Sequence, residues 1–217
     1  MEDQLIRLRL SDCSEWDGVR EVCSLTGIDG RPISPERFSF FGEYWIGPYQ
    51  LLEPQWTWVV VRGVGQPKVI GYLTGCPNSG HFQKERAGRF LPKLWSQVLT
   101  GKYHQTGDVR RAWRRESGYE ALPTAEFDEE FSDVLSSKYP AHLHMNLLPE
   151  GRGMGIGERL HQEFVVALSS ERVPGIHLYC GSGPLRHYLK NGFHVLGERR
   201  WGPAKVSIYL LGKALKS

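Results

Sequence analysis

The sequence has few cysteines, and their spacing suggests no shared site. Its 217 residues include 4 cysteines, none of them in a C-x-x-C motif. They stand apart at Cys13, Cys23, Cys76 and Cys180. This spacing predicts neither a zinc site nor a thioredoxin-like redox motif, and a chain of this length needs no disulfides to fold. We therefore expect no metal site and no disulfide framework.

The sequence also lacks a long apolar run and a strong net charge. Its most apolar short segment, Trp56–Val61, is far below the roughly 20 residues needed to cross a bilayer. The first residues, Met1–Gln4, are acidic and polar, whereas a signal peptide begins basic and then becomes apolar. The formal net charge of +3 is too small to indicate nucleic acid. These absences predict a cytoplasmic protein that neither associates with a membrane nor binds nucleic acid.

One basic cluster needs a separate interpretation. It consists of Arg110, Arg111, Arg114 and Arg115. Such a cluster is typical either of a nucleic-acid surface or of a solvated helix face. The acidic run Glu126–Glu130 follows soon after and interrupts any long basic stripe, so we favour the solvated helix.

The first two thirds of the chain alternate between clear and unclear patterns. Ser11-Asp12 offers a helix N-cap, and apolar residues then recur at helical spacing from Trp16 to the breaker Gly27. Alternating apolar residues predict strands at Leu5–Leu10, Gln55–Arg62 and Lys68–Cys76, the last two forming a hairpin. Glycine, proline and aromatic residues predict an irregular stretch with short helical pieces over 28–54. Residues 77–139 carry no strand pattern, and we expect a helical insertion laid over the sheet.

The last third has a regular alternation of strands and helices. We predict strands at Ala141–Leu148, Gly175–Cys180, His194–Trp201 and Lys205–Leu211. Helices are predicted at Gly155–Ser170 and Pro184–Lys190, the second ending at the C-cap Asn191-Gly192. The order predicts one α/β (α+β) domain over 1–217 with three layers. Its central sheet should be mixed and mostly antiparallel, with helices on both faces.

A glycine-dense turn is the most informative segment. Arg152-Gly153-Met154-Gly155-Ile156-Gly157 lies between a predicted strand and a predicted helix. Glycines leave backbone N–H groups uncovered, and a helix N-terminus adds the positive end of the macrodipole, which together suit a phosphate or pyrophosphate. A dinucleotide fingerprint does not match, because Ile156 and Glu158 occupy positions where it needs glycine. A P-loop does not match either, because its Gly-Lys-Ser/Thr ending is absent.

The pattern R-x-x-G-x-G, formed by Arg152, Gly155 and Gly157, resembles the pyrophosphate loop of the GNAT superfamily of N-acetyltransferases. The segment Tyr188–Phe193 matches that family's Y-x-x-x-G-F motif at the usual distance from the loop. A closer resemblance, to bacterial acetyltransferases related to the C-terminal domain of O-GlcNAcase, extends over nearly the whole chain. It is carried by 22–27, 47–49, 71–75 and 139–144.

The GNAT resemblance implies acetyl-CoA as cofactor and direct attack of an amine on its thioester, without an acyl-enzyme. The Leu147 amide would polarise the thioester carbonyl, and Tyr188 would protonate the departing thiolate, unless its ring only packs. Many relatives have Asn and Ala where this chain has Gly181 and Pro184, which removes one cofactor contact. The residues implied to hold the cofactor are Leu147, Leu148, Arg152, Gly153, Met154, Gly155, Ile156, Gly157 and Glu158.

The general base has several candidates. His144 is of a suitable type, and the string His142-Leu143-His144 is similar to serotonin N-acetyltransferase. Counting in steps of two from Leu147, however, places His144 on the opposite face from Leu143 and Met145. His144 is therefore either the general base, if a bulge turns it toward the site, or a hydrogen-bonded structural histidine. In the second case a bound water or an insertion carboxylate such as Glu129 would serve as the base.

The acceptor is predicted to be a small-molecule or peptide amine. Six aromatic residues of the first half are candidates for walls of its pocket, with core packing as the alternative: Phe38, Phe40, Phe41, Tyr44, Trp45 and Tyr49. Arg186 and Lys190 either contact the 3′-phosphate of CoA or lie solvated on the surface. A rival hypothesis is a non-catalytic acetyl-CoA- or peptide-binding module. The oligomeric state stays open, with a homodimer as one option.

Overall fold

The computed structural model describes residues 6–10, 12, 14–28, 30–63, 67–118, 124–201 and 204–215, and a seven-stranded sheet forms its centre. The strand order is β1-β2-β3-β4-β5-β7-β6. Neighbouring strands are antiparallel except β4 and β5, which are parallel, so the predicted mixed and mostly antiparallel sheet is confirmed. The strands are β1 (Ile6–Leu10), β2 (Thr57–Arg62), β3 (Lys68–Cys76), β4 (Ala141–Leu147), β5 (Gly175–Gly181), β6 (His194–Trp201) and β7 (Val206–Ala214).

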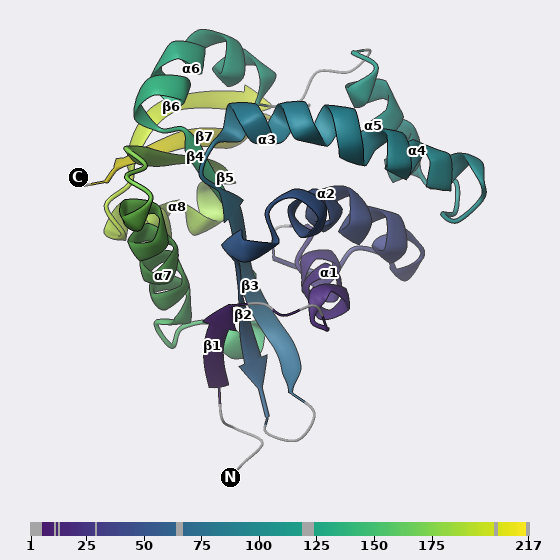
Figure 1. The fold of residues 1–217 in the computed structure, drawn as a ribbon, viewed down its shortest axis with the longest axis horizontal. Helices are drawn as coiled ribbons and strands as arrows, with labels where there is room; N and C mark the ends of the chain where they lie inside the picture. Colours follow the sequence, from purple (N-terminus) through teal and green to yellow (C-terminus); the bar gives the residue numbers. More distant parts are fainter. Residues whose placement is uncertain are drawn as a thin grey trace.

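Helices cover both faces of this sheet (Figure 1). On one face lie α1 (Trp16–Leu25), α2 (Phe38–Leu52) and α6 (Ala125–Lys138), and on the other lie α7 (Ile156–Ser170) and α8 (Ser182–Lys190). Aromatic contacts hold helices to both faces. Phe164 of α7 packs edge-on against Trp58 of β2, and Phe127 of α6 packs against Tyr179 of β5 on the opposite face. The predicted three-layer arrangement is therefore confirmed.

Residues 28–54 are more regular than the predicted irregular stretch with short helical pieces. Phe38–Leu52 forms the 15-residue helix α2, preceded by a 3-10 turn, Pro35–Arg37, and followed by another, Pro54–Trp56. Its glycines are packing positions, since a Cβ on Gly42 would lie 2.9 Å from Arg20 of α1 and one on Gly47 2.6 Å from Phe90. Tertiary burial therefore outweighs the low helix propensity of glycine and of the internal Pro48.

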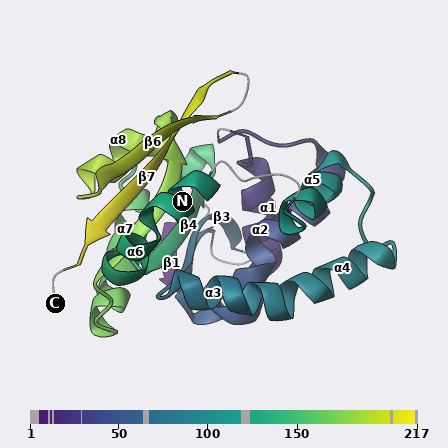
Figure 2. The same ribbon diagram turned by 90° about the horizontal axis from the view of Figure 1, so that it is seen from above.

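The insertion is helical, as predicted, but only part of it lies over the sheet. It contains α3 (Ser79–Glu85), a π-helical turn η4 (Arg86–Phe90), α4 (Leu91–Leu99), α5 (Gly107–Glu116) and α6. The helices α4 and α5 pack on α2, through a separate cluster that includes Phe40, Leu94 and Val109 (Figure 2). This placement corrects the expectation, because α2 stands between them and the sheet. Among the described residues, no helix has both the length and the apolar character that membrane crossing requires.

Several predicted boundaries move by a few residues. The helix α1 begins after Glu15, not after Ser11-Asp12; Asp12 instead accepts a hydrogen bond from the backbone of Ser14, and Ser11 lies outside the described residues. The predicted end of α8 is confirmed, with Asn191 as C-cap and Gly192 at a φ of 83°. The last strand runs further than predicted, to Ala214. The cysteines that the structure describes, Cys23, Cys76 and Cys180, are buried and free.

Candidate active site

The strands β4 and β5 separate soon after they begin. Their pairing covers only Ala141 with Ile176 and His142 with His177. Beyond this point β5 stays hydrogen-bonded to β7, and every residue of β5 pairs with that strand. The edge of β4 from Leu143 to Leu147 therefore faces a wedge-shaped opening in the sheet rather than a paired strand.

The backbone donors of β4 can be assigned to the two sides of the strand. The Leu148 amide donates to the Ile70 carbonyl at 2.8 Å, on the β3 side. Antiparallel hydrogen bonding alternates along a strand, so the amides of Asn146 and His144 also face β3, and those of Leu147 and Met145 face the wedge. Leu147 thus has the orientation predicted for a carbonyl polariser, whereas the amide of Leu148 belongs to the sheet.

The glycine turn lies at the end of this edge and is open. Gly153 and Gly155 have φ angles of 76° and 72°, and a Cβ added to either would have no atom within 4 Å. These angles favour glycine, and the space beside them admits a bulky anion. Gly155 is the N-cap of α7, and no side chain caps this helix end. Met154 is 52% exposed beside it.

The residues that follow the turn anchor it to the body of the protein. Ile156 is buried in the main core, and Gly157 lies beside the ring of His187, to which an added Cβ would approach at 3.2 Å. Glu158 is exposed in the first turn of α7. The loop is therefore held from its C-terminal side and open on its outer side.

Arg152 has a different environment from the one that its place in the loop suggests. Its Nε donates to the Leu147 carbonyl at 2.9 Å, and its Nη2 donates to the Gly30 carbonyl at 3.0 Å. The guanidinium therefore ties the loop to the end of β4 and to the connection between α1 and α2. In this arrangement the backbone of the loop, more than the Arg152 side chain, is available to an anion.

Tyr188 lies on α8, which follows β5, so it comes from the side of the wedge opposite to Leu147. Its ring is 6% exposed and packs edge-on against Phe193 at a centroid distance of 5.5 Å. Burial raises its pKa well above the ordinary value, so the phenol stays protonated at neutral pH. It is a hydrogen-bond donor with a proton to give.

Gly181 and Pro184, which depart from the family pattern, lie at the start of the same helix. Gly181 is the N-cap of α8, with no atom within 4 Å of an added Cβ, and Pro184 lies in the first turn. Arg186 and Lys190 are exposed on α8.

His144 points to the α2 face of the sheet, as the register predicted. Its Nδ1 lies 3.5 Å from the Tyr72 hydroxyl, its Nε2 3.3 Å from the Asn146 amide nitrogen, and its ring 6.4 Å from that of Trp45. Burial lowers its pKa to about 4, so the imidazole is neutral at pH 7. Its pKa is thus lower than a general base at neutral pH prefers. The other candidate, Glu129, is exposed on α6.

His142 is fixed by a network that sequence reasoning did not find. Its Nε2 lies 2.8 Å from the Tyr49 hydroxyl, and its Nδ1 lies 2.7 Å from Ser79 Oγ and 3.2 Å from Cys76 Sγ. Burial lowers the pKa of His142 to about 3 and raises that of the Cys76 thiol to about 12. These partners come from α2, α3 and β3, so the network joins the insertion to the sheet.

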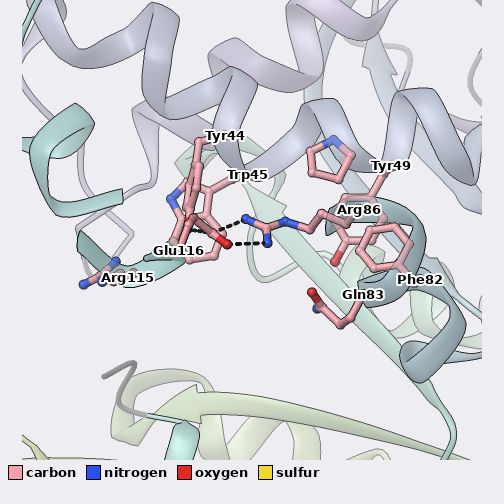
Figure 3. A pocket seen from close by; sticks show the side chains of 9 residues that line it. Tyr44, Trp45, Tyr49, Phe82, Gln83, Arg86, Arg115 and Glu116 are labelled. Atoms are coloured by element: carbon pink, nitrogen blue, oxygen red, sulfur yellow. Dashed lines mark hydrogen bonds and ion pairs between the residues drawn. The ribbon is translucent and has the colours of Figure 1, made fainter. Parts of the chain in front are cut away.

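A pocket of about 270 Å³ opens on the α2 face (Figure 3). It is lined by Tyr44, Trp45, Pro48, Tyr49, Phe82, Gln83, Arg86, Arg115 and Glu116. A second hollow, of about 320 Å³, shares Tyr44, Trp45 and Arg115 with it and is also lined by Phe40 and Phe41. Five of the six predicted aromatic residues therefore line one hollow or both, although Phe40, Tyr44 and Tyr49 are also buried. Phe38 lines neither.

Two charged residues of the pocket, Arg86 and Glu116, were missed by sequence reasoning. Arg86 makes two hydrogen bonds to Glu116, at 3.2 and 2.6 Å, and Tyr44 donates to the same carboxylate at 2.6 Å. Arg86 also lies over the Tyr44 ring. Arg86 in η4 and Glu116 in α5 are 30 residues apart in the sequence, so a local sequence pattern does not predict their pairing.

Solved structures share this arrangement over nearly the full chain. SsHAT is similar over 98% of this chain and 99% of its own, with a TM-score of 0.71 and 25% identity. A GCN5-related N-acetyltransferase from Kribbella flavida is similar over 97% and 98%, with a TM-score of 0.53 and 13% identity. The Drosophila melanogaster polyamine N-acetyltransferase is similar over 97% and 100%, with a TM-score of 0.55 and 14% identity.

The chain has the GNAT fold. No protein-family model matches the sequence. The GNAT resemblance is thus confirmed for the fold. The roles expected for the glycine turn, Leu147 and Tyr188 stay predictions. The closer resemblance to relatives of O-GlcNAcase stays a prediction.

Proposed function

We propose that the protein is an acetyl-CoA-dependent N-acetyltransferase that forms a single domain and transfers acetyl to a primary amine. The observation that carries the proposal is the open glycine turn at the end of the wedge. Gly153 and Gly155 adopt positive φ angles beside empty space, at the uncapped N-terminus of a 15-residue helix. This combination suits a diphosphate, since backbone donors and the helix dipole both favour negative charge.

The residues present are suited to coenzyme A. Backbone groups from Gly153 to Gly157 would hold the diphosphate, with Met154, Ile156 and Glu158 shaping the loop around it. The wedge-facing amides of Met145 and Leu147 would bind the pantetheine arm and the thioester carbonyl, while Leu148 and Arg152 hold the edge in place. Bound acetyl-CoA would supply the activated acetyl thioester.

Two side chains are proposed to manage the protons. Tyr188 would donate its proton to the sulfur as the thioester bond breaks, a task for which a protonated phenol is suited. His144, neutral at pH 7, would accept the proton of the amine directly or through a water. It links β4 to Trp45 at the pocket wall, so the amine would arrive from the α2 face while the thioester lies in the wedge.

The low pKa of His144 favours one alternative, a non-catalytic acetyl-CoA- or peptide-binding module. Both the enzyme and the binding module require affinity for the cofactor, so only turnover distinguishes them.

The test is titration calorimetry with acetyl-CoA, followed by a thiol-release assay on a panel of primary amines. We expect binding and turnover for the natural sequence and no measurable binding for Gly155→Glu. Gly101→Glu is the matched control, because Gly101 has a φ of 80° and empty space beside it but lies at the end of α4. Binding without turnover would favour the module, and unchanged binding by Gly155→Glu would refute the site.

A further inference from the structure

The side chain of His187 lies beside the glycine turn, where α8 contacts α7. A Cβ added to Gly157 would lie 3.2 Å from Cε1 of this ring, 3.5 Å from its Nε2 and 3.6 Å from Cδ1 of Leu147. His187 and Leu147 therefore approach the first turn of α7 at the same point, next to the wedge. The proposed function gives no role to this histidine.

The Nε2 atom of His187 is buried and has no hydrogen-bond partner among the described residues. The same holds for Nε2 of His161, one turn further along α7. The ring of His161 packs on Phe193, with 5.2 Å between ring centroids, whereas that of His187 contacts the turn. Buried polar atoms in folded proteins normally have a partner, so this atom calls for one that binding would supply.

The side chains of the turn offer an anion little positive charge. Arg152 already donates to the carbonyls of Leu147 and Gly30. Glu158 adds a negative charge in the first turn of α7. A bound diphosphate would therefore gain from a cation on a neighbouring element, and the imidazole of His187 on α8 lies closest to the point described above.

The surroundings of His187 keep it largely neutral in the free protein. Burial lowers its pKa, and the carboxylate of Glu158 acts in the opposite direction. Burial, helped by Lys213 and His187, lowers the pKa of His161 to about 3, so that neighbour is neutral as well. The titratable groups around His187 are Glu158 and His161 on α7, Lys213 on β7, and Arg186, Tyr188 and Lys190 on α8 itself.

We infer that His187 is a further binding residue for coenzyme A, which takes up a proton from solvent and donates a hydrogen bond from Nε2 to the diphosphate. The side chain is half-buried, so a change in its torsion angles is enough to expose Nε2. The negative charge of the diphosphate then offsets the cost of a buried cation. Because binding and protonation are coupled, cofactor affinity increases as the pH falls. The inference rests on the proposed function and adds a residue and a pH dependence to its cofactor site.

Calorimetry with dephospho-CoA tests this coupling. The probe keeps the diphosphate and lacks the 3′-phosphate, whose own proton would add to the count. Heats of binding at pH 6.5 in MES and in Bis-Tris, two buffers of different ionisation enthalpy, give the number of protons taken up. For the natural sequence we expect about half a proton, and an affinity that increases about threefold or more from pH 8 to pH 6.

The variant His187→Gln supplies an amide donor near the position of Nε2 but no group that titrates. Its affinity should match that of the natural sequence at pH 8 within about threefold and fall behind it at pH 6, with no proton uptake. Acetyl-CoA, measured in parallel, should give the same difference between the two proteins. The control is His104→Gln, an exposed histidine between α4 and α5, which should keep both the uptake and the pH dependence.

Two results would overturn the inference and leave the proposed function in place. One is proton uptake that is absent from the natural sequence or survives in His187→Gln. The other is an equal loss of affinity in His187→Gln at pH 6 and pH 8, which a merely structural histidine would produce. Absence of binding by both dephospho-CoA and acetyl-CoA would refute the proposed function, and this inference with it.

Discussion

Arg152 is bonded to the carbonyl of Leu147 at 2.9 Å and so connects the glycine turn to the edge of β4 that faces the wedge. The amide and the carbonyl of one residue thus have separate tasks. The carbonyl of Leu147 holds the loop, and its amide faces the opening.

Replacement of Arg152 by Gln should loosen this connection. The two hydrogen bonds to Leu147 and Gly30 would be lost, at a cost of about 1 kcal/mol in unfolding free energy, since the side chain is exposed. Acetyl-CoA affinity should fall by about tenfold, because the loop is less ordered before binding. Calorimetry and urea unfolding measure both effects. Arg159→Gln, an exposed change on α7, is the control, and an equal loss there would contradict the assignment.

Replacement of Tyr188 by Phe separates chemistry from packing. The ring and its contact with Phe193 remain, so we expect the melting temperature and the acetyl-CoA affinity to stay near those of the natural sequence. The rate kcat should fall by about 10²-fold, the typical contribution of a general acid. Steady-state kinetics and calorimetry check this. A variant with full kcat would mean that Tyr188 serves only to pack.

Replacement of His144 by Gln tests the proposed base. Burial lowers the pKa of His144 to about 4, so its titration should not shape the pH profile of kcat/KM between pH 5 and 8. We expect His144→Gln to lower kcat by about tenfold or more at pH 7 while acetyl-CoA affinity is kept. An unchanged kcat would assign the proton transfer to water or another group.

Acid should destabilise the fold through its buried histidines. Burial lowers the pKa values of His142, His144 and His161 to about 3, 4 and 3, below the ordinary value of 6.5. The unfolded chain therefore binds protons that the folded chain does not. The free energy of unfolding is therefore unaffected by these groups above pH 6.5. It falls below that pH, down to about pH 4 for His144 and about pH 3 for His142 and His161, by up to about 1.4 kcal/mol per pH unit for each histidine.

Urea unfolding at pH 7 and pH 5 measures this effect. His161→Phe should make the dependence of the unfolding free energy on pH less steep. A stability that rises as the pH falls to 5 would contradict the sign.

Two glycines, Gly47 at the contact between α2 and the insertion and the exposed Gly88 in η4, should respond differently to alanine. A Cβ on Gly47 would lie 2.6 Å from Phe90 and from Glu43, so Gly47→Ala should destabilise the protein by about 1–3 kcal/mol. Gly88 has no atom within 4 Å of an added Cβ, and Gly88→Ala should be neutral or stabilising by up to about 1 kcal/mol. Thermal unfolding of both variants checks the pair, and similar losses would contradict this account.

The sequence predicts the parts of the fold that depend on local patterns. The alternation in β4 placed His144 and Leu143 on opposite faces, and the glycine spacing located a turn whose positive φ angles only glycine adopts readily. These features depend on neighbouring residues, so they can be read from a short segment. The proposed roles of Tyr188 and of the loop residues await the experiments above.

The parts that sequence reasoning missed depend on distant residues. Helix α2 forms because Gly42 and Gly47 admit Arg20 and Phe90 closely, a contact that no local propensity contains. The pairing of Arg86 with Glu116 spans two helices, and the lowered pKa of His144 comes from burial by residues far along the chain. Interpreting glycine and proline as helix breakers limited the prediction over 28–54 to short helical pieces.

The brief contact between β4 and β5 divides the sheet into two hydrogen-bonded blocks, one of four strands and one of three. Continuity between them depends on the pairing of Ala141 and His142 and on the core cluster, which contains residues of both blocks. A molecule bound in the gap along Leu143–Leu147 would contact both blocks and restrict their movement relative to each other. Amide exchange in β6 and β7 should then slow when the gap along Leu143–Leu147 is occupied.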